Sequence, residues 1–144
     1  MTTDRFARGQ SRQRSLGTNT ARAGAYDDLA DIAPDLPRLA TEFAYGDIHC
    51  RSGLSAGKRE LVIIAVLITL GDVEPQIEAH VSSALGAGVE PREIVEAVIQ
   101  TIPYAGFPRA LRAMSSVRGT LQAHGALDQL AIETPTPTRT QTED

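Results

Sequence analysis

The chain has 144 residues, a formal net charge of −4 and a hydrophobic content of 42%, which is ordinary for one globular domain. No apolar run approaches the roughly 18 residues that a membrane-spanning helix needs, and residues 1–10 contain no apolar segment typical of a secretory signal. One cysteine excludes an internal disulfide, so we expect a cytoplasmic protein without membrane contact.

The first part of the chain is basic. Residues 1–22 carry five arginines against one aspartate, a net charge of +4, which leaves −8 for the remainder. A basic segment can bind nucleic acid, but this one has a single aromatic residue, Phe6, and the rest of the chain is acidic. We therefore expect no nucleic-acid partner. We interpret residues 1–24 as a basic N-terminal arm that either places arginines over an anionic ligand or is solvated.

Residues 25–130 are interpreted as one helical domain. A first core helix is predicted near residues 35–48, with Pro37 in its first turn and four apolar residues along one face: Leu36, Leu39, Phe43 and Ile48. Residues 50–57 are typical of a connection. Ser55 can then serve as the N-cap of a helix over 56–70, and Gly71 can end that helix.

The segment 56–70 is apolar on nearly all sides. Its β-branched residues would also suit a buried strand, but the segment is longer than a typical strand, which favours a helix. A helix without a polar face is typical of the centre of a core. We therefore expect this helix to be enclosed.

Three further helices are predicted over residues 72–88, 89–102 and 107–125. Pro75, Pro91 and Pro108 suit their first turns. Pro103 is expected to break or kink the second of them near its end. Without a hairpin signal or an internal repeat, the pattern predicts an all-α fold, a compact domain of about six helices. Residues 131–144 repeat Thr-Pro and are predicted to be a disordered tail.

His80 lies on the helix predicted over 72–88, at the margin of an apolar stripe formed by Ile77, Val81, Ala84, Leu85 and Gly88. At such a margin a histidine can be half-buried while one ring nitrogen faces a cavity. A lone histidine is also commonly a core or surface residue without chemistry. His49, His80 and His124 have no short metal-ligand spacing, so we expect no metal site.

A series of short motifs runs through residues 36–122. In chain order they are Gly46-Asp47-Ile48, Arg51, Gly53-Leu54, Arg59-Glu60-Leu61, His80, Ala84-Leu85, Gly88-Val89, Glu93-Ile94, Glu96 and Tyr104-Ala105-Gly106-Phe107-Pro108. This combination resembles the carboxymuconolactone decarboxylase family, the decarboxylase branch of the alkylhydroperoxidase-D-like superfamily. The chain departs from the family pattern at His49, where Trp is usual, at Cys50, where Ser or Thr is common, and at Ser52, where Pro is usual.

The resemblance also separates the chain from the redox branch, which uses C-x-x-C-x-x-x-H. Aligned on His80, the two thiol positions hold Val73 and Gln76, so dithiol chemistry is excluded. Glu60 matches the relay glutamate of that branch when one inserted residue is allowed. The resemblance therefore implies His80 and Glu60 as a proton-handling pair. The alternative for Glu60 is an acid near a helix start that favours the helix dipole.

The reaction that the resemblance implies needs no cofactor, because the lactone carbonyl of a carboxylated butenolide accepts the electrons that CO₂ leaves behind. The protein must hold carboxylates, stabilise an enolate oxygen and deliver a proton to carbon. His80 is the candidate acid, and Glu60 orients it. Candidate substrate-binding residues are Arg51, His49, Tyr104, Arg12 and Arg14. The alternatives are solvation for Arg51 and packing beside Pro103 for Tyr104.

The resemblance further implies a small anionic, carboxylated lactone-like substrate and a ring-like homo-oligomer, commonly a trimer or hexamer. Two other functions stay open. One is a peroxidase or peroxiredoxin-type protein that works with Cys50 alone, and the other is a non-catalytic helical ligand-binding protein. Because His49 and Cys50 are adjacent, their side chains diverge in most backbones, which disfavours a nucleophilic Cys–His pair. The sequence leaves open the substrate, the pathway and the effect of His49 on the reaction.

Overall fold

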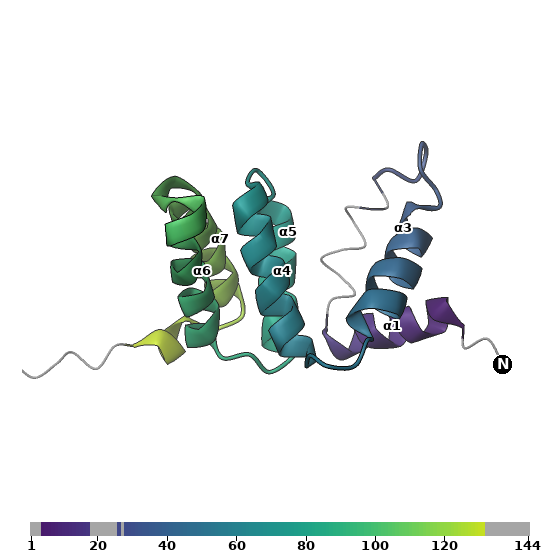
Figure 1. Ribbon diagram of the computed structural model, residues 1–144, viewed down its shortest axis with the longest axis horizontal. Helices are drawn as coiled ribbons and strands as arrows, with labels where there is room; N and C mark the ends of the chain where they lie inside the picture. The colour runs from purple at the N-terminus through teal and green to yellow at the C-terminus, as the bar shows by residue number, and fades with distance from the viewer. Residues whose placement is uncertain (1–3, 18–25, 27, 132–144) are drawn as a thin grey trace, which may run out of the picture.

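The computed structural model describes residues 4–17, 26 and 28–131 (Figure 1). These residues are all-α, as predicted, and no strand occurs among them. The helices are α1 (Arg5–Ser15), α3 (Leu36–Leu39), the π-helix η1 (Ala40–His49), α4 (Ala56–Leu70), α5 (Glu74–Gly86), α6 (Pro91–Ala105), α7 (Phe107–Ala123) and the 3₁₀ helix η2 (Leu127–Leu130). No helix in this part of the chain is long and apolar enough to cross a membrane. Apart from residue 131, the predicted disordered tail lies outside the described residues.

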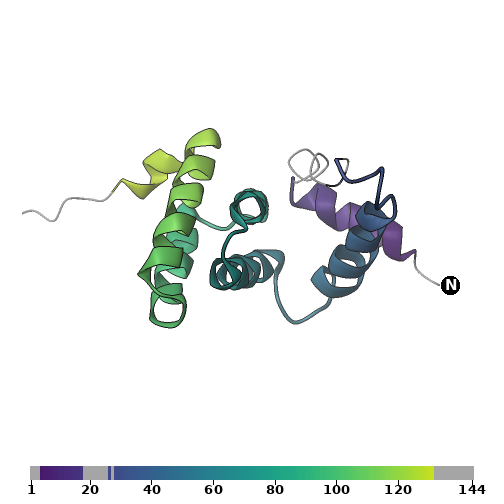
Figure 2. The same cartoon turned by 90° about the horizontal axis from the view of Figure 1, so that it is seen from above.

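Helices α4 to α7 form a four-helix unit. Both α4 and α7 pack against α5 and α6, and Figures 1 and 2 show the pair α6–α7 beside the pair α4–α5. The core cluster consists of aliphatic residues from these helices and the turns that follow them: Ile64, Ile68, Ile77, Val81, Ala84, Val89, Ile94, Val98, Ala110, Ala113, Val117, Leu121 and Ala126. Each fully buried Val, Leu or Ile stabilises the fold by about 1.5–3 kcal/mol, so this unit holds the α4–α5 pair in place.

Local signals set the helix boundaries. The Ser55 hydroxyl accepts a hydrogen bond from the backbone N–H of Lys58 at 3.4 Å, and α4 ends at Gly71, whose φ is 74°. At Pro103, where a break or kink is predicted, α6 is not broken: it continues to Ala105, and the chain turns at Gly106. Since Pro103 lies near the end of α6, it removes one of the last hydrogen bonds and leaves the middle of the helix intact.

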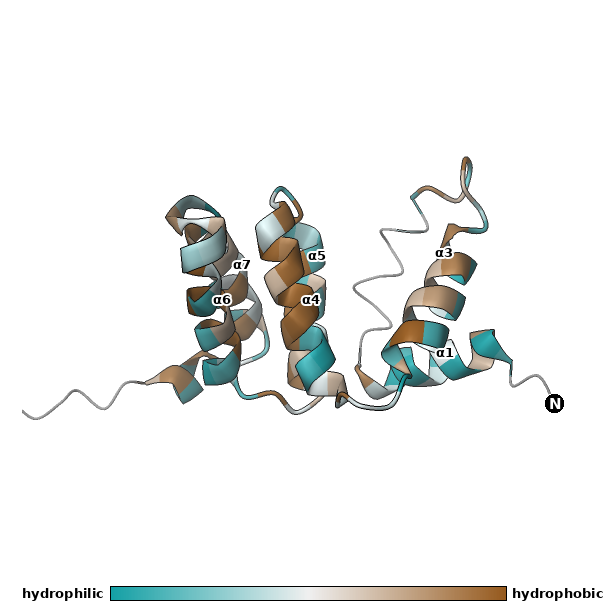
Figure 3. Cartoon of the chain, viewed as in Figure 1, coloured by the Kyte–Doolittle hydropathy of each residue, from teal (hydrophilic) through white to brown (hydrophobic). Residues whose placement is uncertain are grey.

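The helix over 56–70 is not enclosed by the described part of this single chain. The buried residues of α4 form one stripe, Gly57, Glu60, Ile64 and Ile68. On the other side Val62, Val66 and Leu70 are 55%, 52% and 64% exposed, and Figure 3 shows this apolar side of α4 toward the viewer. The side chains of these three residues are therefore left largely uncovered by the described part of the chain.

Helices α1 and η1 pack together beside the four-helix unit (Figure 2). Two glycines permit this contact, because a Cβ on Gly9 would collide with the carbonyl of Thr41 and a Cβ on Gly46 with the carbonyl of Arg5. The guanidinium of Arg5 also pairs with the carboxylate of Asp47. The described part of the predicted basic arm is therefore a helix that is docked on η1.

The segment predicted as a regular helix near 35–48 is mostly a π-helix. Its wider winding is seen where the backbone N–H of Cys50 donates to the carbonyl of Tyr45, five residues earlier, at 3.1 Å. Thr41, Tyr45 and His49 follow one another at intervals of four and are all buried. All four residues of the predicted apolar face are exposed: Leu36, Leu39, Phe43 and Ile48. The π-helix therefore turns two ring side chains, Tyr45 and His49, inward.

Candidate functional site

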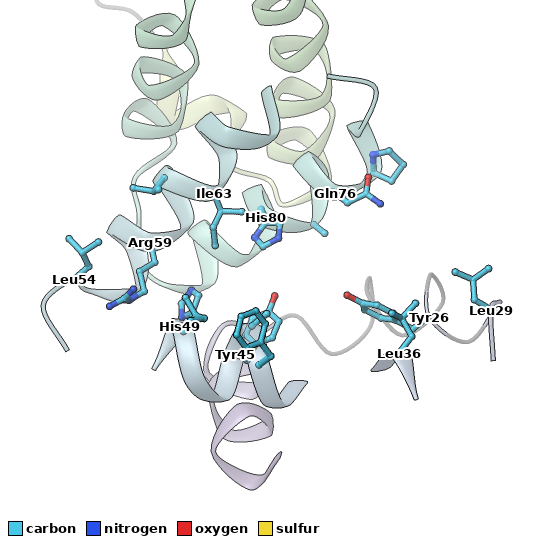
Figure 4. Close-up of a pocket in the computed structure, with 16 residues that line it drawn as sticks. Tyr26, Leu29, Leu36, Tyr45, His49, Leu54, Arg59, Ile63, Gln76 and His80 are labelled. Atoms are coloured by element: carbon cyan, nitrogen blue, oxygen red, sulfur yellow. The ribbon is translucent and has the colours of Figure 1, made fainter. Parts of the chain in front are cut away.

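A cavity of about 680 Å³ lies between η1 and the helices α4 and α5 (Figure 4). Most of its wall is apolar and includes Leu36, Phe43, Ile48, Leu54, Val62 and Ile63. The polar side chains that reach the wall are those of Tyr26, Tyr45, His49, Arg59, Gln76 and His80. A mainly apolar cavity with a few convergent polar groups is the usual form of a small-molecule site.

Glu60 is the centre of the polar part of this site. It lies on the second turn of α4 and is 0% exposed. Its Oε1 lies 2.9 Å from Nε2 of His49, and its Oε2 lies 2.6 Å from Nδ1 of His80. Glu60 thus lies one turn inside α4 and is buried, unlike an acid that only favours the dipole at a helix start. A buried carboxylate is costly unless hydrogen bonds compensate it, and the two imidazole rings provide them.

The ionisation of Glu60 fixes which nitrogens carry hydrogen. Burial, the largest influence, raises the pKa of the Glu60 carboxyl. The hydrogen bonds from His49 and His80, together with the positive charge that a ring carries when it is protonated, outweigh burial, so the pKa of Glu60 lies below its ordinary value. Glu60 is therefore a carboxylate at neutral pH and can only accept hydrogen bonds. His49 donates through Nε2–H and His80 through Nδ1–H.

His80 has the partial burial that its place on α5 predicts. Its side chain is 17% exposed and lines the cavity, whereas Ile77, Val81 and Ala84 of the neighbouring stripe are buried. Its Nδ1 is engaged by the carboxylate of Glu60. This arrangement is that of a histidine whose tautomer is set by a carboxylate.

His49 is more deeply buried than His80, at 4% exposed, although it also lines the cavity. Its ring stacks on Tyr45, with 5.8 Å between centroids, and its Nδ1 is buried without a hydrogen-bond partner in the described structure. The neighbouring thiol of Cys50 is directed to the backbone carbonyl of Arg8, at 3.9 Å. The two adjacent side chains therefore diverge, as predicted. Among the residues that the structure describes, no group of three or more His, Cys, Asp or Glu could hold a metal ion.

Four of the predicted substrate-binding residues do not line the cavity of this single chain. Arg51 is exposed in the connection before α4, and Tyr104 is 84% exposed on α6. Arg12 and Arg14 lie in the last turn of α1. A role for these arm residues in substrate binding would require the cavity of a second copy.

Arg59 and Gln76 line the cavity, although the sequence analysis did not select them as binding residues. Nη2 of Arg59 donates to the carbonyl of Arg51 at 2.7 Å and to that of Ser52 at 3.3 Å, and its Nε is buried without a partner within the described chain. Arg59 is the one permanently charged residue among the described residues of the wall. Two features of the sequence could have pointed to these residues. Arg59 is next to Glu60, and Gln76 lies four residues before His80, the spacing of neighbours on a helix surface.

The fold and the site define a helical protein with a buried carboxylate between two histidines at the wall of a small-molecule cavity. The model of the carboxymuconolactone decarboxylase family matches residues 34–118, more than half of the chain. The chain therefore belongs to the carboxymuconolactone decarboxylase family.

Three relatives give this membership more detail. The chain is 34% identical over 88 residues to the 4-carboxymuconolactone decarboxylase of Acinetobacter baylyi, across 61% of this chain and 65% of the relative. It is 33% identical over 87 residues to an uncharacterized 15.0 kDa protein of Paracoccus denitrificans, across 60% and 65%. It is 31% identical over 83 residues to the nitrosuccinic acid decarboxylase of Metarhizium robertsii, across 58% and 57%. Each match spans less than two thirds of the relative's length.

Proposed function

We propose that this protein is a carboxy-lyase that removes CO₂ from a small carboxylated lactone-like substrate without a cofactor, with His80 as the proton donor. The observation that carries the proposal is the hydrogen bond from His80 Nδ1 to the buried Glu60 at the wall of a cavity that also receives Arg59. Membership of the family, and two relatives that are named as decarboxylases, support the reaction class. We further propose that the protein acts in the cytoplasm, where its single cysteine would stay reduced.

Substrate binding is assigned to Arg59. A guanidinium holds a carboxylate through charge-assisted hydrogen bonds, and two backbone carbonyls already fix one end of the Arg59 side chain. The carboxylate that leaves would face the apolar part of the wall. Loss of CO₂ converts that anionic group into a neutral, apolar molecule, which an apolar wall accommodates more easily than a charge.

The reaction then needs one electron sink and one proton. The carbon–carbon bond to the leaving carboxylate breaks, CO₂ departs, and the electron pair enters the conjugated lactone so that negative charge develops on its carbonyl oxygen. The amide of Gln76, one helical turn before His80 on the same cavity wall, can donate a hydrogen bond to this oxygen. Protonated His80 gives its Nε2 proton to carbon, and the neutral ring then takes a proton from water.

Glu60 makes this proton transfer possible without taking part in it. Its negative charge stabilises the protonated form of His80, and its Oε2 fixes the orientation of the ring. The redox alternative is less well supported, because Cys50 is directed to the Arg8 carbonyl and does not line the cavity.

Turnover by the purified protein tests the function. The protein, without thiol or added cofactor, is incubated with 4-carboxymuconolactone and with nitrosuccinate, and CO₂ release is measured. We expect release from the carboxylated lactone that Cys50→Ser leaves unchanged. Peroxide consumption that Cys50→Ser abolishes would establish the redox alternative. Binding of these carboxylates without CO₂ release would support the ligand-binding alternative.

A further inference from the structure

His49 is the second imidazole on Glu60, and the reaction proposed above makes no use of it. Glu60 comes from α4, His80 from α5 and His49 from η1, so one carboxylate joins three elements. The two hydrogen-bond distances, 2.9 Å and 2.6 Å, place both rings in direct contact with the same negative charge. A proton that one ring takes up therefore changes the proton affinity of the other ring.

The cluster can take up one proton more easily than two. With both rings neutral its charge is −1, and one added proton makes it neutral. A second proton would leave a net positive charge, with two like charges on either side of one carboxylate. Because Glu60 is 0% and His49 is 4% exposed, water screens this repulsion weakly. A proton on one ring therefore opposes a proton on the other.

The surroundings of the rings decide which of them takes the proton. Nδ1 of His49 is buried without a partner in the described structure, so protonation there would bury an unpaired, charged N–H group. His80 is more exposed, at 17%, and because its Nδ1–H already donates to Glu60, an added proton goes to Nε2, which is not among the buried atoms that lack a partner in the described structure. The shared proton therefore resides on His80, and His49 stays neutral and donates to Oε1.

We propose that His49 is a positioning residue that acts through Glu60 to lower the proton affinity of His80. While His49 donates to Oε1, part of the carboxylate charge is engaged in that bond. Without the bond, the whole charge would act on His80 and would keep it protonated to higher pH. His49 would thereby set the pH range over which His80 can release a proton. The role of His80 as an acid rests on the proposed function, whereas the coupling of the rings can be measured without substrate.

Other charged or titratable groups also face the two rings. They are Arg59 from α4, Tyr45 from η1 and Tyr26 ahead of α3, which line the same cavity, whereas the thiol of Cys50 beside His49 is directed away to the Arg8 carbonyl. All of them are retained in the variants below. Their effect on His80 is therefore common to every protein that is compared, and a difference between variants reports His49.

The test is an NMR titration of the imidazole nitrogens in the full chain without ligand. Glutamine can place an N–H donor near Nε2 of His49 but takes up no proton, whereas phenylalanine keeps a ring against Tyr45 and has no donor. We expect His49→Phe to raise the apparent pKa of His80 by about one unit, and His49→Gln to leave it near the wild-type value. His124, which contacts Ser82 on α5 and does not line the cavity, is the internal reference and should not change.

A reciprocal variant keeps the test decisive if His49→Phe does not fold. His80→Asn keeps an N–H donor near Nδ1 and removes the competing charge. By linkage, His49 should then take up its proton at higher pH than in the wild type. An unchanged His80 titration in His49→Phe, or an unchanged His49 titration in His80→Asn, would show that His49 only joins η1 to α4. Neither result depends on whether the protein is a decarboxylase.

Discussion

Arg59 and Arg51 are eight residues apart and differ in what they face. Arg59 lines the cavity and Arg51 does not. A hydrogen bond between charged groups contributes about 1.5–3 kcal/mol, so Arg59→Gln should raise KM for a carboxylated substrate by about tenfold or more. Arg51→Gln is the matched control and should leave KM nearly unchanged. If steady-state kinetics showed a raised KM for Arg51→Gln and an unchanged KM for Arg59→Gln, Arg51 would be the substrate-binding arginine, as the sequence predicts, and the assignment to Arg59 would be contradicted.

Glu60 links the site to stability at acid pH. Its pKa lies below the ordinary 4.5 in the folded chain, so the unfolded chain binds the proton more readily. The stability that Glu60 contributes is therefore complete above about pH 4.5 and is lost as the pH falls through the lower, folded pKa. When the free energy of unfolding is measured in urea at a series of pH values, the Glu60→Gln variant should lack this loss of stability at acid pH. Asp47, whose pKa is also lowered, by its hydrogen bond to Arg5, titrates in both proteins and cancels. Equal acid slopes would contradict this account.

Some site residues could be predicted from sequence and others could not, for a physical reason. His80 lies at the edge of an apolar stripe and Glu60 lies in a recognisable motif, so both were accessible to local reasoning. The contact between His49 and Glu60 was not, although only eleven residues separate them. It depends on the turn between η1 and α4 and on the π-winding that turns His49 inward, and neither follows from helical periodicity.

At the scale of elements, local chemistry predicted where the helices lie. Ser55, Gly71 and the prolines at helix starts act on their own neighbours, so their effect can be inferred from the sequence alone. The exposure of α4 could not be inferred in this way. It depends on how many helices of the same chain cover α4, and the pattern of apolar residues does not show that number. The wide winding of η1 was also missed, since the apolar spacing of its segment fits an ordinary α-helix.

The docking of α1 on η1 depends on Gly46. A Cβ at this position would collide with the carbonyl of Arg5, so Gly46→Ala should loosen α1. We expect a lower melting temperature and faster tryptic cleavage at the arginines of α1. Gly119→Ala is the control, because nothing lies within 4 Å of its Cβ position on α7. There alanine should stabilise the helix by up to about 1 kcal/mol. Equal cleavage of the two variants would mean that close contact at Gly46 does not hold α1.

At the scale of the whole molecule, the single chain leaves apolar surface uncovered. One group lies on α4, namely Val62, Val66 and Leu70, and another lies where α6 meets α7, namely Tyr104, Phe107 and Leu111. Exposed apolar patches are typical of interaction sites. Together with the family resemblance, they support our proposal that the protein assembles into a homo-trimer or homo-hexamer.

Sedimentation equilibrium at micromolar concentration tests the assembly. We expect a mass several times that of the chain, and Val66→Glu should weaken the assembly without a loss of helix content, because this side chain lies outside the core cluster. A wild-type protein that stays monomeric would contradict the proposal.

The central claim, that His80 delivers the proton in a decarboxylation, is tested most directly by the rate of CO₂ release in His80→Asn. Asparagine keeps an N–H donor near Nδ1, so Glu60 stays hydrogen-bonded, but it has no titratable nitrogen. Because one general acid contributes roughly 10²–10⁴-fold to a rate, kcat should fall by that factor while circular dichroism and sedimentation stay as in the wild type. Full activity in the variant, on a substrate that the wild type decarboxylates, would contradict the claim, as would loss of the fold.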